Sequence, residues 1–180
     1  MDLSQSFHQR LNITPAQGEM RDGAIRYLMM RPDVLMGMFA RLPESIRGEA
    51  LAALTASVAE NGGKSVKAYR DSGAAAPAAM MKTIAATSGE LGWGVWSFET
   101  VSSEQIDVTV ENSPFAHGYI AATGASDSLS EAPICAPIKG MLSAIGPLLL
   151  DCDAVDVSET SCFAQTGEGP CRFTLKRAAA

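Results

Sequence analysis

All four cysteines of this 180-residue chain lie in its last third, and a glutamate precedes one of them by three residues. Sulfur-rich sites with four protein ligands are typical of a structural zinc ion. The pattern predicts one zinc ion held by Cys135, Glu159, Cys162 and Cys171. The alternative is four small core residues without a metal, because free cysteine is often buried. The remaining cysteine, Cys152, is either an inert core thiol or a metal ligand in place of Glu159.

The predicted elements around these residues bring them together. Pro137 suits the first turn of a helix, so Cys135 lies at a helix N-terminus, which favours the thiolate. Glu159 and Cys171 fall on the apolar faces of two predicted strands. Cys162 follows where the first of these strands gives way to a turn. A hairpin therefore unites three of the ligands, and the helix start supplies the fourth.

The rest of the chain alternates between strand and helix patterns, which predicts an α+β fold with an antiparallel β-sheet packed by helices on one face. Asn61, Gly62 and Gly63 predict the end of a helix. Residues 1–22 are expected to be a flexible arm, 23–177 a single domain, and 118–130 a loop or lid. We expect strands at 23–30, 93–100, 105–111, 154–159 and 171–176, and helices at 32–42, 44–60, 65–70, 74–91 and from Pro137, which Pro147 kinks or ends.

Composition excludes several classes of function. A net charge of -6 argues against nucleic-acid binding, which needs clustered Lys and Arg. No apolar run is long enough to span a bilayer, and the N-terminus lacks the apolar segment of a signal peptide. We therefore expect a cytoplasmic protein with reduced thiols and no transmembrane segment. No glycine-rich nucleotide-binding motif or nucleophile motif occurs, so no catalytic residue is assigned.

Several short motifs resemble the 4-vinyl-reductase domain family of small-molecule-binding modules. The matching pieces are Asn112 to Ala116, Cys135 with Gly140, Glu159 with Cys162, Gly167, and Cys171 to Phe173. The resemblance implies a fold similar to that of aromatic-sensor domains and of TRAPP trafficking subunits, which carry an apolar tunnel and dimerise. It also implies zinc on the three cysteines and the glutamate named above. The segments 92–96 and 135–141 look closest to the bacteriochlorophyll 4-vinyl reductase-like members.

Six residues are candidate contacts for an apolar ligand. Trp93 and Trp96 offer flat stacking surfaces, and methionine adapts to irregular shapes. The sensor members keep an aromatic residue where this chain has Val110. For each candidate the alternative is ordinary packing, or for His117 a solvated loop position. The six candidates are Trp93, Trp96, Val110, Phe115, His117 and Met141.

These observations predict a zinc-stabilised, homodimeric binding protein for a hydrophobic small molecule: a tetrapyrrole, an aromatic compound or a lipid. The resemblance to the bacteriochlorophyll 4-vinyl reductase-like members implies a chlorophyll precursor as the ligand, presented to the enzymes of pigment biosynthesis. One alternative is a 4-vinyl (proto)chlorophyllide reductase that uses an external reductant, because the sequence shows no site for a hydride source. Another is a one-domain sensor of aromatic or lipid ligands. The segments 34–42 and 44–60 are the expected dimer interface.

Overall fold

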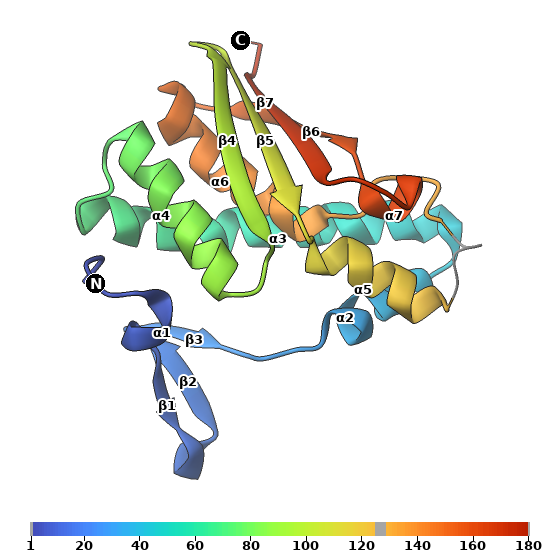
Figure 1. Cartoon of the computed structure of the whole chain (residues 1–180), viewed down its shortest axis with the longest axis horizontal. Helices are drawn as coiled ribbons and strands as arrows, with labels where there is room; N and C mark the ends of the chain where they lie inside the picture. The colour runs from blue at the N-terminus through green and yellow to red at the C-terminus, as the bar shows by residue number, and fades with distance from the viewer. Residues whose placement is uncertain (1, 125–128, 180) are drawn as a thin grey trace.

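A four-stranded antiparallel sheet forms one layer of the molecule, and helices cover one of its faces, as the sequence predicts (Figure 1). This computed structural model describes residues 2–124 and 129–179. The strand order is β4-β5-β7-β6. The strands are β4 (Val95–Ser102), β5 (Gln105–Glu111), β6 (Val155–Ser161) and β7 (Cys171–Arg177).

The covered face of the sheet carries the core. Helix α6 (Ala136–Leu150) packs against β6 and β7, and α4 (Pro77–Glu90) packs against β4. Alternate residues of β5 and β7 are buried there, while the residues between them carry polar groups to the other face. Buried members of this core include Ile106, Val108, Val110, Phe173, Leu175, Ile138 and Leu142.

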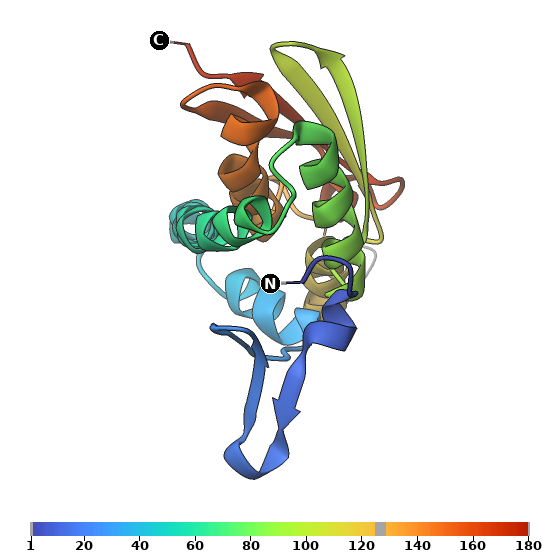
Figure 2. The ribbon, with the colours of Figure 1, turned by 90° about the vertical axis from the view of Figure 1, so that its left-hand side faces the viewer.

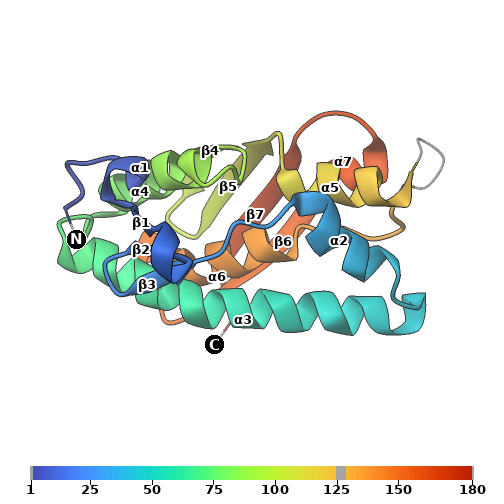
Figure 3. The ribbon, with the colours of Figure 1, turned by 90° about the horizontal axis from the view of Figure 1, so that it is seen from below.

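One helix is longer than predicted. Helix α3 (Glu44–Asp71) continues through Gly62 and Gly63, where the sequence predicted an end, and includes the separate helix expected at 65–70. The Asn61 side chain donates a hydrogen bond to the carbonyl of Ser57 within this helix. Each glycine weakens a helix by only about 1 kcal/mol, whereas α3 packs along α6 (Figure 3). The predicted helix end was wrong because tertiary packing outweighs this local preference.

The expected loop at 118–130 is partly helical. Helix α5 (Pro114–Thr123) crosses α2 (Pro32–Ala40), and a side chain on Gly118 would come within 2.6 Å of the Pro32 backbone. Gly118 therefore serves a close helix contact rather than a loop. A one-turn helix that the sequence did not predict, α7 (Phe163–Thr166), follows β6. Residues 125–128 of the expected loop lie outside the described residues.

The N-terminal residues form a small structured unit that projects from the helical body (Figure 2). A buried ion pair joins Arg10 and Asp22 at 3.1 Å within it. Its second and third strands pair across the expected boundary between arm and domain; the flexibility of this arm stays a prediction, and Met1 lies outside the described residues. The unit contains α1 (Phe7–Arg10), β1 (Asn12–Thr14), the 3-10 helix η1 (Pro15–Gln17), β2 (Glu19–Asp22) and β3 (Ile25–Tyr27).

A membrane-spanning helix needs about 20 predominantly apolar residues. Across residues 2–124 and 129–179, we find no helix with both the length and the apolar character that a bilayer crossing requires.

Candidate metal centre and ligand cavity

The four predicted metal ligands lie together. The donor atoms of Cys135, Glu159, Cys162 and Cys171 are all within 4.8 Å of one another. The sulfur of Cys135 is 3.6 Å from that of Cys171 and 4.0 Å from that of Cys162. The three cysteines are buried, and so is one carboxylate oxygen of Glu159. The group could therefore hold a metal ion.

Each ligand comes from the end of an element or from an irregularity in one. Cys135 is the N-cap of α6, Cys162 is the N-cap of α7, and Cys171 begins β7. Two residues three apart on a regular strand point to opposite faces. The pairing of β6 with β7 shifts register between Glu159 and Ser161, which adds one residue to β6. This bulge lets Glu159 and Cys162 face the same cluster.

The electrostatics of the cluster favour a cation. One oxygen of Glu159 accepts a hydrogen bond from the backbone N–H of Cys135 at 3.1 Å, while its other oxygen is buried without a partner among the described residues. Burial raises the pKa of Glu159 to about 8. Hydrogen bonds from the thiols of Cys135 and Cys162 lower the pKa of Cys171 to about 4. A divalent cation would satisfy the free oxygen and compensate the thiolate, so the donor set fits zinc.

A separate apolar cavity of about 280 Å³ lies between β3, α3, α4 and α6. Aromatic and aliphatic side chains form most of its wall, and Thr87 and Ser88 add hydroxyl groups. The main side chains of the wall are Ile25, Tyr27, Tyr69, Ile84, Trp93 and Met141.

The structure brings two of the six predicted ligand contacts, Trp93 and Met141, to this cavity. The ring of Phe115 meets the ring of Trp93 edge-on, with centroids 5.2 Å apart, and lies behind the wall. The sequence did not point to Tyr69 or Ile84, because the wall combines four elements whose contact a linear pattern does not reveal. Their spacing marks them only as core positions of two helices.

The other three predicted contacts lie elsewhere. Trp96 is buried, and its indole N–H donates to the carbonyl of Trp93 at 3.1 Å. Val110 is buried in β5 opposite Cys171. His117 is exposed, and its ring lies on that of Phe163, with centroids 4.2 Å apart. None of the three lines the 280 Å³ cavity. Ligand contacts by all six residues stay predictions.

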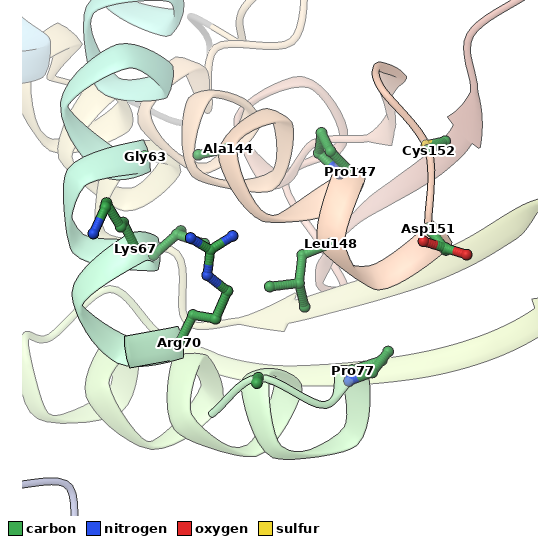
Figure 4. A pocket seen from close by; sticks show the side chains of 11 residues that line it. Gly63, Lys67, Arg70, Pro77, Ala144, Pro147, Leu148, Asp151 and Cys152 are labelled. Carbon is green, nitrogen blue, oxygen red and sulfur yellow. The ribbon is translucent and has the colours of Figure 1, made fainter. Parts of the chain in front are cut away.

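A wider groove of about 710 Å³ separates the C-terminal halves of α3 and α6 (Figure 4). Lys67 and Arg70 lie on its α3 side, and both pair with Asp71. Cys152 lies at the other side, where its thiol donates to the carbonyl of Ala154 at 3.2 Å. Within the described part of the chain, the metal cluster does not include Cys152. The glutamate therefore completes the cluster.

Among the comparisons with known proteins, one solved structure supports this architecture. No family model matches this sequence, and no curated protein matches it. The crystal structure of the phenol-responsive sensory domain of the transcription activator PoxR with phenol is similar, with a TM-score of 0.76 and 18% identity, covering 97% of this chain and 88% of that one. A trafficking protein particle complex subunit 3 from Naegleria fowleri, covalently bound to palmitic acid, gives a TM-score of 0.48 at 8% identity over 82% of this chain and 95% of that one. The PoxR likeness confirms the fold, while the resemblance to 4-vinyl reductases stays a prediction.

Proposed function

We propose that this chain is a zinc-stabilised binding module for a small apolar molecule the size of a substituted aromatic ring. The cavity of about 280 Å³ is the observation that carries this proposal. A dry apolar cavity of about 150 Å³ is large enough for benzene, so one ring with a polar substituent fits here. Tyr69 and Trp93 offer aromatic surface to such a ring, and Thr87 offers a hydroxyl group to the substituent.

Sensing of an aromatic ligand is the version of this function with the most support. The PoxR domain, described as phenol-responsive, shares the fold over nearly the whole chain. A chlorophyll precursor has four pyrrole rings and would require this cavity to enlarge. The carrier and 4-vinyl reductase versions, with pigment-biosynthesis enzymes as partners, rest on the sequence resemblance alone.

The zinc ion would have a structural role. Cys135, Glu159, Cys162 and Cys171 would hold it, and the ion would tie the start of α6 to the β6–β7 hairpin. Four protein ligands leave no open position for a substrate, which is typical of a structural site. In small metal-binding domains, the free energy of metal binding contributes directly to folding.

A second copy of the chain is the proposed macromolecular partner. Five apolar side chains, each more than half exposed, follow one another from the end of β3 into α2. They would lose contact with water in a homodimer, the commonest assembly of soluble proteins. We call this set the apolar stripe: Leu28, Met29, Met30, Val34 and Met38.

A fluorescence titration tests the ligand proposal. Trp93 lines the cavity and Trp96 does not, so phenol should quench the wild type and the Trp96→Phe variant saturably. The Trp93→Phe variant should lose the signal while calorimetry still detects binding. Divinyl protochlorophyllide and a long-chain fatty acid serve as competitors. Saturable quenching by the pigment alone would favour the carrier function, and no response to any of the three would contradict a binding module.

A further inference from the structure

Two side chains of the N-terminal unit complete the wall of the apolar cavity. Ile25 and Tyr27 of β3 line it, and the other lining residues come from the segment 57–141. Side chains alternate along a strand, so these two share one face of β3, while Arg26 between them is more than half exposed. Burial, together with the nearby Tyr69 hydroxyl, raises the pKa of Tyr27. Tyr27 therefore faces the helical body across the cavity.

We propose that Ile25 and Tyr27 are ligand-contacting residues that determine specificity, and that the N-terminal unit, residues 7–27, closes the cavity over the bound molecule. This inference rests on the proposed function, because it requires a small molecule in this cavity. It also links residues 7–22, which belong to the segment expected to be a flexible arm, to the two lining residues that follow that segment.

The N-terminal unit is tied together internally. The Arg10–Asp22 ion pair joins α1 to β2, and the two side chains are only 7% and 5% exposed. The ring of Phe7 meets the ring of Tyr27 edge-on, with centroids 5.0 Å apart. Strand β2 also pairs with both β1 and β3. A displacement of β3 from the cavity would therefore carry the whole unit with it.

The N-terminal unit is held to the helical body by fewer interactions than hold it together internally. The backbone N–H of His8 donates to the Glu90 carboxylate at 3.0 Å, and α1 packs against α4. The segment that leads from β3 to α2 runs over the surface, with Leu28 and Met29 each 79% exposed (Figure 3). Regions with few buried apolar contacts open most readily. A ligand that touches both walls binds the closed state more tightly and so raises its population.

The test compares two isoleucines of the same small sheet. Ile25 lines the cavity, whereas Ile13 on β1 is 54% exposed and does not line it. With phenol as the probe, calorimetry should show binding weakened by about tenfold in Ile25→Ala, because buried methyl groups are lost, and unchanged in Ile13→Ala. In the wild type, phenol should slow amide hydrogen exchange at β3.

The outcomes separate this inference from the proposed function. Phenol binding as strong in Ile25→Ala as in Ile13→Ala would overturn the contact role of Ile25. Unchanged exchange at β3 when phenol is bound would overturn the closing role of the N-terminal unit. Either result would leave the binding function intact. A wild type that binds neither phenol nor the other two compounds would overturn the proposed function, and this inference with it. The exchange measurement uses the unmodified chain, so it decides the question even where Ile25→Ala unfolds.

Discussion

At the scale of single residues, the carboxyl group of Glu159 distinguishes a metal site from a group of buried thiols. One of its oxygens accepts a hydrogen bond from the backbone N–H of Cys135, and the other has no hydrogen-bond partner among the described residues. A buried acceptor without a partner costs about 1–3 kcal/mol, more when it is charged. Bound zinc would remove that cost, so the same side chain should destabilise the metal-free protein and stabilise the metal-bound one.

Replacement of Glu159 by glutamine separates these two effects. We expect Glu159→Gln to weaken zinc binding by at least about tenfold, the scale seen when even supporting groups of a metal site are removed. Competition with a chromophoric chelator measures this affinity. The control is Cys152→Ser, which should retain zinc because Cys152 lies outside the cluster. A Glu159→Gln protein that binds zinc like the wild type would show that Glu159 is not a ligand.

The same variant has a pH-dependent effect on the metal-free chain. The folded-state pKa of Glu159 is about 8, raised by burial from 4.5. For a raised pKa, the contribution to stability is fully present below the unfolded value, about pH 4.5, and is lost as the pH rises through about 8. The wild type should therefore lose stability relative to Glu159→Gln as the pH rises from 5 to 8. Urea unfolding of the metal-free proteins measures this difference in the free energy of unfolding.

The sequence indicated the metal residues more completely than the cavity residues. The alternation of apolar and polar side chains along two strands was enough to place Glu159 and Cys171 on the same covered face. The bulge that turns Cys162 toward them has no sequence signature, because it depends on how β6 pairs with β7. Tyr69 reaches the cavity only because α3 continues past the point where the sequence predicted its end.

At the scale of elements, the crossing of α3 and α6 fixes where the metal site and the cavity lie. Gly140 permits this crossing, because a Cβ atom there would lie 2.5 Å from the Thr55 carbonyl oxygen and 2.7 Å from the Val58 Cβ. The Thr55 hydroxyl also bonds to the carbonyl of Ala136 at 3.2 Å, at the start of α6. The helix that begins at Cys135 is thus held against α3 by close backbone contact.

A pair of glycine substitutions tests this crossing. Gly140→Ala should destabilise the protein by about 1–3 kcal/mol, because the added methyl group forces the helices apart. Gly63→Ala is the matched change on α3, where a Cβ would meet no atom of the described residues within 4 Å. It should stabilise the protein by about 0.5–1 kcal/mol through helix propensity. Urea unfolding of the zinc-loaded proteins measures both values, and equal effects would contradict the assigned role of Gly140.

Helical spacing and strand alternation predicted most elements, and two of the misses involve glycine. The hairpin of β4 and β5 and the helices α2, α4 and α6 lie close to their expected ranges. A predicted loop failed at Gly118 in α5, where a Cβ atom would lie 2.6 Å from the Pro32 backbone, and a predicted helix end failed at Gly62 in α3, which faces Met141 and Ala144 of α6. A glycine that permits close packing and one that ends a helix look the same in a single sequence.

At the scale of the whole molecule, the apolar stripe begins in the link between the N-terminal unit and α2 and continues onto α2. Figure 1 shows the course of this link. Only part of the expected interface is free to meet a partner. Val34 and Met38 lie one turn apart on α2 and are 58% and 53% exposed, whereas Leu51 of α3 is buried. The interface proposed for the dimer therefore centres on α2 and the segment before it.

Replacement of one exposed valine at a time tests this interface. Sedimentation equilibrium should give twice the chain mass of 18.9 kDa for the wild type and the chain mass for Val34→Glu, because each copy would bury an unpaired carboxylate in the interface. Val101→Glu is the matched control, since Val101 is 53% exposed on β4, away from the stripe. A wild type that sediments as a monomer at micromolar concentration would contradict the dimer. If both variants remain dimeric, the dimer forms through another face, and the apolar stripe is left for a different partner.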